Sequence, residues 1–214
     1  MAIVKSGPYV GFSGTVDGIT YCPQPDGTTT AKKKNTRTTK PDSKDQASVK
    51  DDTGIFSGAI KHLLDLINFG YALEAKTKTM SPWNTMVQCN RKVVLQGEYP
   101  NRYVDFSKLL LTKGTLPLPV NLAATRTAKG LVYSWSSEVL PKRSHYSDHL
   151  IMVAYFPELE ESRYLLSGAL RSAGTDILSL EGIKKGNKAH VYAAFITDDH
   201  KGISNSVYLG QFNW

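Results

Sequence analysis

The sequence has little cysteine and none of the common catalytic motifs. Its two cysteines, Cys22 and Cys89, are too few for a disulfide framework and stand at no metal-binding spacing. We expect both thiols to be reduced or buried, with a single bridge as the alternative. The G-x-S-x-G elbow, the Walker loop and the G-x-G-x-x-G fingerprint are all missing. We therefore expect no enzyme: no catalytic residue, no metal, no cofactor and no small-molecule substrate.

Long apolar runs are also missing. No stretch reaches the roughly 18 apolar residues of a transmembrane helix, so the sequence predicts no membrane span. The first residues, MAIVKSGPYVGFSG, lack the continuous apolar core of a signal peptide. We expect a cytoplasmic protein or one that is built into a virion.

What the sequence does contain is a foldable and basic composition. Hydrophobic residues make up 41% of the chain, which is enough to bury a core. The formal net charge is +7. A basic balance favours acidic partners, either nucleic acid or an acidic neighbouring subunit.

Residues 1–22 alternate glycines with single apolar residues, a pattern that predicts short strands and tight turns. Two alternatives follow: the strands pair within the chain as a hairpin, or they lie along another subunit as added strands. The candidate strand-addition segment contains Tyr9, Val10, Phe12, Val16 and Ile19.

Residues 23–41 carry almost no apolar side chains, so this stretch is expected to form an extended basic arm. The arm is solvated, or it orders on a neighbouring subunit, or it binds phosphate groups. The acidic cluster Glu158, Glu160 and Glu161 is one subunit surface that it could meet. The candidate contact residues are Lys32, Lys33, Lys34, Arg37 and Lys40.

Residues 42–118 are expected to form a helical hairpin followed by a strand. Apolar residues at helical spacing predict one helix from about Asp42 to Gly70. Gly54 and Gly58 lie four residues apart in it and suggest either close helix packing or small core positions. Ser81 and Pro82 predict the start of a second helix that ends at Gly97. A strand follows at 103–111, and a domain boundary is expected near Pro119.

Residues 119–214 read as an antiparallel β-sandwich, because seven short strands are separated by turn residues. Alternating Val191, Ala193 and Phe195 predict a strand with one buried and one solvent-exposed face. The expected strands are 121–127, 130–135, 149–156, 164–170, 176–180, 189–197 and 204–212.

Trp135 ends the second expected strand of this segment, and Tyr192 lies inside a strand with the pattern Y-x-x-x-[IV]-T that is followed by D-x-x-G-x-S-x-S. With these residues the segment resembles a fibronectin type III domain. The resemblance implies an immunoglobulin-like binding or spacer module, in which this tryptophan and this tyrosine pack across the sandwich.

Four further segments are distributed along the whole chain: GFSGTV at 11–16, DFSKLLL at 105–111, GTLP at 114–117 and SNSVYLG at 204–210. Through these segments the chain resembles an uncharacterised family of bacterial and phage proteins. The family implies no activity that can be transferred to this chain.

The sequence therefore predicts an α+β protein with N-terminal strands, a basic arm, an αα-hairpin and a C-terminal immunoglobulin-like sandwich. The function that fits best is that of a structural, self-associating component of a phage head, neck or tail. The partners would be further copies of the chain or other virion proteins. The alternatives are a nucleic-acid-associated protein that uses the basic arm and an adhesion or carbohydrate-binding module.

Overall fold

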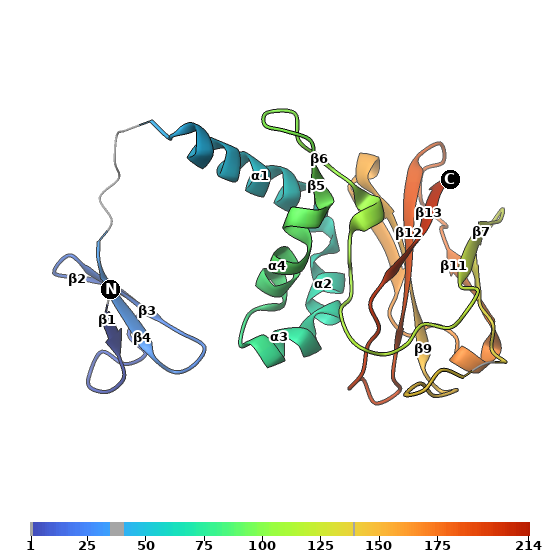
Figure 1. Ribbon diagram of the computed structural model, residues 1–214, viewed down its shortest axis with the longest axis horizontal. Coiled ribbons are helices and arrows are strands. Elements are labelled where there is room, and N and C mark those ends of the chain that lie inside the picture. Colours follow the sequence, from blue (N-terminus) through green and yellow to red (C-terminus); the bar gives the residue numbers. More distant parts are fainter. Residues whose placement is uncertain (1, 35–40, 139) are drawn as a thin grey trace. The chain divides into compact units, whose positions relative to one another are not determined.

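The chain folds into two compact units, Met1–Lys44 and Asp45–Trp214, called here the N-terminal and C-terminal units. The structure is a computed structural model that describes residues 2–34, 41–138 and 140–214. Figure 1 shows strands in the first unit, and helices followed by sheets in the second. The expected boundary near Pro119 falls inside the C-terminal unit.

The N-terminal unit is a four-stranded antiparallel sheet with the order β1-β4-β3-β2. Its strands are β1 (Ala2–Val4), β2 (Gly14–Val16), β3 (Ile19–Pro23) and β4 (Thr29–Lys33). The prediction of an extended arm from residue 23 onwards was therefore wrong for its first part, because β4 lies inside the sheet and pairs with both β1 and β3. Arg37 and Lys40 lie outside the described residues.

The C-terminal unit begins with a helical layer that contains more helices than the two of the expected αα-hairpin. Its helices are α1 (Lys44–Ile60), α2 (Leu64–Gly70), α3 (Ala72–Lys78) and α4 (Pro82–Val94), with the 3-10 turn η1 (Lys61–Leu63) between α1 and α2. The start of α4 was predicted correctly, since the Ser81 hydroxyl accepts a hydrogen bond from the Asn84 amide. No helix in the described part of the chain has the length and hydropathy needed to cross a membrane.

The helical glycines differ from expectation. Gly54 and Gly58 are exposed on α1, and a β-carbon at either position would have no atom within 4 Å. Both the close-packing interpretation and the core interpretation were therefore wrong. Gly70 ends α2 as predicted, and there a β-carbon would lie 2.6 Å from the Leu111 carbonyl oxygen. Glycine at this position allows the 109–112 segment to approach the helix.

The expected strand 103–111 is mostly not a strand. Only β6 (Tyr103–Val104) pairs, with β5 (Leu95–Gln96), and the turn η2 (Phe106–Lys108) follows. The next residues are held by side chains on both sides. The Asn90 amide binds the backbone of Leu110, and the Ser206 hydroxyl accepts from the Leu111 amide. Hydrogen bonds to side chains thus satisfy the backbone of Leu110 and Leu111, in place of the strand pairing that was predicted for 103–111.

Two antiparallel sheets complete the C-terminal unit. One has the order β11-β8-β7 and the other the order β10-β9-β12-β13. The short turns η3 (Pro157–Leu159) and η4 (Arg171–Ala173) lie between strands. The strands are β7 (Ala123–Arg126), β8 (Gly130–Ser134), β9 (His149–Phe156), β10 (Glu161–Leu165), β11 (Thr175–Ser179), β12 (Lys188–Ile196) and β13 (Val207–Asn213).

All seven expected strands are present, although the predicted strand 164–170 is displaced. β10 ends at Leu165, and Leu170 makes only an isolated bridge to His149. The arrangement of helices and antiparallel sheets confirms the α+β class.

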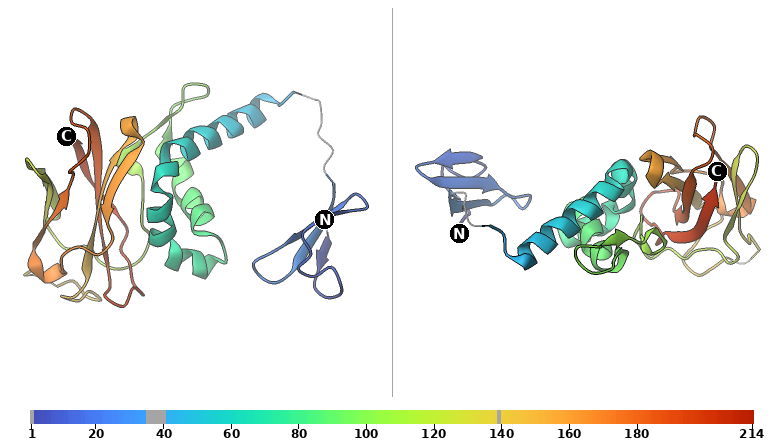
Figure 2. Two further views of the ribbon diagram at one scale, coloured as in Figure 1. Left: turned by 180° about the vertical axis from the view of Figure 1, so that it is seen from behind. Right: turned by 90° about the horizontal axis from the view of Figure 1, so that it is seen from above.

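The sheet β10-β9-β12-β13 of the C-terminal unit is covered on both faces. Alternate residues of β12, such as Val191 and Phe195, lie in a core shared with the three-stranded sheet. The residues between them, such as Tyr192 and Ala194, lie in a second core with the helices. Figures 1 and 2 show the helices along one face of this sheet. The prediction that one face of β12 is solvated was wrong, because the helical layer covers it.

The same layering corrects the expected aromatic contact. Trp135 lies in the core between the two sheets, where its ring meets Phe195 edge-on at 5.5 Å. Tyr192 points to the opposite face, and its hydroxyl donates to the Phe106 carbonyl at 2.7 Å. The two side chains therefore do not pack together across the sandwich.

Candidate interaction surface

The sheet of the N-terminal unit has one apolar and one polar face. Directly opposed residues in antiparallel strands point to the same side, so the register assigns each side chain to a face. One row contains Ala2, Ala31, Tyr21 and Gly14, and the next contains Lys33, Ile19 and Val16. The opposite side carries mainly threonines and Lys32, together with Cys22 and Ile3. We call the first side the apolar face.

Three aromatic rings gather on the apolar face. Tyr9 stacks on Tyr21 with ring centroids 5.1 Å apart, and Phe12 meets Tyr21 edge-on at 5.7 Å. The Gly11 amide donates to the hydroxyl of Thr29 and fixes the loop that carries Tyr9 and Phe12 to the sheet. Thr29 is the only fully buried residue in the described part of this unit. The sheet therefore has almost no core of its own.

The rest of the apolar face is open. Val16 and Ile19 are each 40% exposed, although both are β-branched and apolar. Beside them lies a groove of about 530 Å³ whose lining includes Ala2 and Ala31. The complete lining of the groove is Ala2, Asp17, Gly18, Ile19, Ala31, Lys32 and Lys33. A sheet of this size with an uncovered apolar face is at most marginally stable in water.

The candidate strand-addition residues do not share one strand. Tyr9, Val10 and Phe12 lie in the loop between β1 and β2, whereas Val16 and Ile19 pair with each other across the β2–β3 hairpin. Of the two alternatives for residues 1–22, the structure has the pairing within the chain. The strands β1 and β2 remain the outer strands of this sheet.

The basic residues are gathered at one end of the same sheet. Lys32 and Lys33 end β4, and the Lys34 amide binds the carbonyl of Gly18 in the β2–β3 turn. Seven basic and three acidic residues give the N-terminal unit a net charge of +4. Lys32, Lys33 and Lys34 have no ion-pair partner among the residues that the structure describes. Their positive charge is therefore available to a partner.

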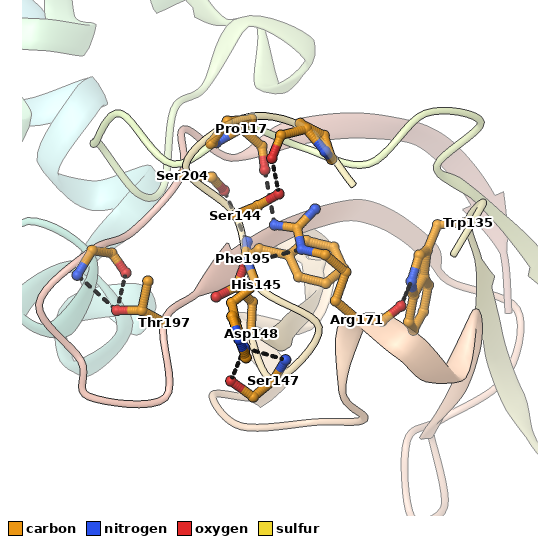
Figure 3. A network of polar contacts seen from close by, with 12 residues as sticks. Pro117, Trp135, Ser144, His145, Ser147, Asp148, Arg171, Phe195, Thr197 and Ser204 are labelled. Carbon is orange, nitrogen blue, oxygen red and sulfur yellow. Dashed lines mark hydrogen bonds and ion pairs between the residues drawn. The ribbon is translucent and has the colours of Figure 1, made fainter. Parts of the chain in front are cut away.

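The C-terminal unit contains a buried ion pair that ties its loops together (Figure 3). The guanidinium of Arg171 donates to Asp148 at 3.0 Å and to the Pro117 carbonyl at 2.9 Å, and it lies 4.4 Å from the ring centroid of Phe195. The Trp135 indole donates to the Arg171 carbonyl. Burial lowers the pKa of Arg171, and the Asp148 carboxylate opposes this shift. With Arg171 only 2% exposed, this network holds loops together and offers no surface to a ligand.

Chemistry-bearing side chains elsewhere are dispersed. No group of three or more His, Cys, Asp or Glu side chains could hold a metal ion within the described ranges. Cys22 and Cys89 are free thiols. In the acidic cluster, Glu160 already pairs with Lys61 at 3.5 Å and with His62 at 3.1 Å. Part of the negative charge proposed as a partner for the basic arm is thus used within the chain.

Sequence reasoning missed several residues of this surface. Tyr21 falls in the predicted N-terminal strands, but its place in the aromatic cluster was not predicted. Ala2 and Ala31 were not predicted as part of the surface, because an alanine side chain has no functional group that indicates a site. Asp17 and Gly18 were missed as a two-residue hairpin turn, which their Asp-Gly pair would have indicated. For the Arg171–Asp148 pair no local signal exists, since 23 residues separate the partners.

Comparison with known proteins assigns the chain to a family. A family model described as "Family of unknown function (DUF6266)" matches residues 9–210. The chain belongs to the DUF6266 family. The match extends from the loop that carries Tyr9 to β13, so DUF6266 spans both units. No curated protein and no solved structure shows significant similarity to the chain.

Proposed function

We propose that this protein is a structural, self-associating protein that assembles through its N-terminal sheet. The observation that carries the proposal is the open apolar face, with Val16 and Ile19 each 40% exposed over a sheet that has one fully buried residue. A sheet needs a second layer against its apolar face. A neighbouring subunit supplies that layer, and the outer strands β1 and β2 offer main-chain groups for strand addition.

The C-terminal unit serves in this proposal as a rigid immunoglobulin-like module of the fibronectin III kind. Strands β7 and β8 share one sheet, and β9, β12 and β13 share the other, which matches the placement of the first, second, third, sixth and seventh strands in immunoglobulin folds. The network around Arg171 and the helical layer make the module stiff. Such a module would act as a spacer that positions the self-associating sheet.

A phage virion is the assembly that we propose for it. Proteins that assemble into larger structures gain contact area between subunits through extended segments and added strands. The resemblance of the whole chain to bacterial and phage proteins supports the same setting.

Mass in solution tests the proposal. We expect light scattering to show one homogeneous oligomer without nucleic acid that persists at high salt, because the attraction from buried apolar area is not screened by ions. A monomer at every protein and salt concentration would overturn the proposal.

Nucleic-acid binding is the second candidate, favoured by the net charge of +4 on the N-terminal unit and by the exposed Tyr9 and Phe12. Lysines bind phosphates and aromatic rings stack on bases. In the same experiment this candidate predicts a monomer that shifts only when single-stranded DNA is added. The complex would dissociate as salt rises, because counterion release drives its formation.

A further inference from the structure

We infer that the apolar face of the N-terminal sheet packs against the same face of a second copy, with a two-fold axis between them. This inference rests on the proposed self-association and specifies its surface, its symmetry and its charge pairs.

The shape of the face is self-complementary. Its groove is lined in part by the small side chains of Ala2 and Ala31, and the larger side chains of Val16 and Ile19 lie in the adjacent row of the sheet. A hollow beside a ridge allows two copies to place the ridge of one in the hollow of the other. Sheets that pack face to face interdigitate their side chains in this way.

The rim charges are self-complementary as well. Asp17 lies in the β2–β3 turn, and Lys33 is paired with Ile19 in the ladder, so both border the groove. Neither has an ion-pair partner in the described part of the chain. A two-fold axis brings Asp17 of each copy to Lys33 of the other, which gives two reciprocal ion pairs.

The net charge selects against less specific contacts. Each N-terminal unit carries +4, so two copies repel, and a contact that brings Asp17 of one copy to Lys33 of the other offsets part of this repulsion. Lys32 lies one residue before Lys33 in β4 and points to the polar face, so its charge stays in solvent in this geometry. Register and charge therefore favour one relative orientation of the two sheets.

A matched pair of variants in one strand tests the face. Ile19→Glu places a charge on the apolar face, and Thr20→Glu places the same charge one residue later on the polar face. Light scattering and sedimentation of the full-length chain should show that Ile19→Glu raises the dissociation constant about 10- to 100-fold, since a buried unpaired charge is costly. Thr20→Glu should assemble like the unmodified chain.

A mixing experiment tests the charge pairs. Asp17 has φ 48°, which asparagine tolerates, so Asp17→Asn removes its charge without strain. Lys33→Glu reverses the other charge. Each variant alone should assemble weakly, and an equimolar mixture should recover in part. The mixed dimer keeps one of the two pairs, between Lys33 of the Asp17→Asn chain and Asp17 of the Lys33→Glu chain.

The outcomes separate this inference from the proposed function. If the unmodified chain is oligomeric while Ile19→Glu assembles normally, self-association stands and the two-fold face is refuted. If both glutamate variants lose assembly, the mixture decides: recovery supports the reciprocal pairs, and no recovery refutes them. A monomeric unmodified chain refutes both the inference and the proposed function, whether or not DNA shifts its mass.

Discussion

Arg171 and Asp148 are both almost fully buried, with 2% and 1% of their surface exposed, and each depends on the other for charge compensation. Removing the Arg171 guanidinium would leave the Asp148 carboxylate buried and unpaired, and that carboxylate also accepts from the His145 amide. A lone buried charge costs far more than the pair contributes. The role of Arg171 is thus to neutralise Asp148 and to fasten the Pro117 carbonyl.

We predict that Arg171→Met lowers the free energy of unfolding by about 3–5 kcal/mol. The double variant Arg171→Met with Asp148→Asn should regain part of that loss, because no unpaired charge stays buried and the asparagine oxygen can still accept from His145. Urea unfolding of the three proteins measures both effects. Equal destabilisation of the single and double variants would show that packing, not charge, dominates at this position.

His190 provides a pH-dependent contribution at the same scale. Burial lowers the pKa of His190 below its ordinary 6.5, an effect that Asp105 opposes and Lys188 reinforces. Its ring lies against Phe106, with centroids 4.7 Å apart, and its Nδ1 lies 3.1 Å from the Tyr208 hydroxyl. Between the folded pKa and 6.5, the unfolded chain therefore holds a proton on His190 that the folded chain does not.

We predict that the stabilisation from neutral His190 is complete above pH 6.5 and is lost as the pH falls through the folded pKa, since stability rises with pH wherever the unfolded state binds more protons. His190→Gln should flatten the fall of the unfolding free energy as the pH drops from neutral to below 6.5. His145→Gln, which changes an exposed ring, is the control and should retain the slope. Chemical denaturation across this pH range is the measurement.

At the scale of elements, the contact of α2 with the 109–112 segment depends on one glycine. A β-carbon on Gly70 would lie 2.6 Å from the Leu111 carbonyl oxygen and 2.7 Å from a methyl of Thr112. The same segment is held by Asn90 and Ser206 and has little freedom to retreat. The helix and the segment therefore require a residue without a side chain where they meet.

We predict opposite effects of alanine at two helical glycines. Gly70→Ala should destabilise the C-terminal unit by about 1–3 kcal/mol through overpacking. Gly58→Ala should stabilise it by up to about 1 kcal/mol, since α1 is open there and alanine is the better helix former. Thermal unfolding of both variants would show shifts of opposite sign, and a neutral Gly70→Ala would mean that the 109–112 segment can move.

At the scale of the whole molecule, the two units differ in what holds them. The C-terminal unit buries two hydrophobic cores, whereas the N-terminal unit has Thr29 as its fully buried residue in the described part. Deleting residues 23–41 would remove β4 from the middle of the N-terminal sheet. Deleting residues 1–43 instead removes the N-terminal sheet as a whole and leaves the C-terminal unit complete.

We predict that a chain of residues 44–214 folds cooperatively, with the melting temperature of the C-terminal unit in the full-length protein, because neither core loses a residue. It should be monomeric, because the apolar face and the outer strands β1 and β2 are gone. Calorimetry and light scattering check the two halves of this prediction. An oligomeric truncated chain would place the main subunit contact in the C-terminal unit.

Much of the fold could be predicted because local patterns are strong where elements are regular. The Ser81–Pro82 start of α4 and the strands β8 and β9 follow from capping and alternation. The candidate surface was predicted only in part: Val16, Ile19 and the lysines were named, but Asp17, Ala2 and Ala31 were not. Residues become a surface through strand register, and register depends on pairings that no single segment encodes.

The sequence by itself determined the α+β class, the N-terminal strands and the seven strands of the C-terminal sheets, because periodicity and turn residues act over a few positions. Only the tertiary structure decided that β4 joins a sheet, that helices cover the second face of β12, and that Trp135 and Tyr192 point apart. Each of these depends on which layer lies against a strand, and that choice minimises exposed apolar area over the whole chain. The apolar face of the N-terminal sheet stays exposed, with Val16 and Ile19 each 40% exposed.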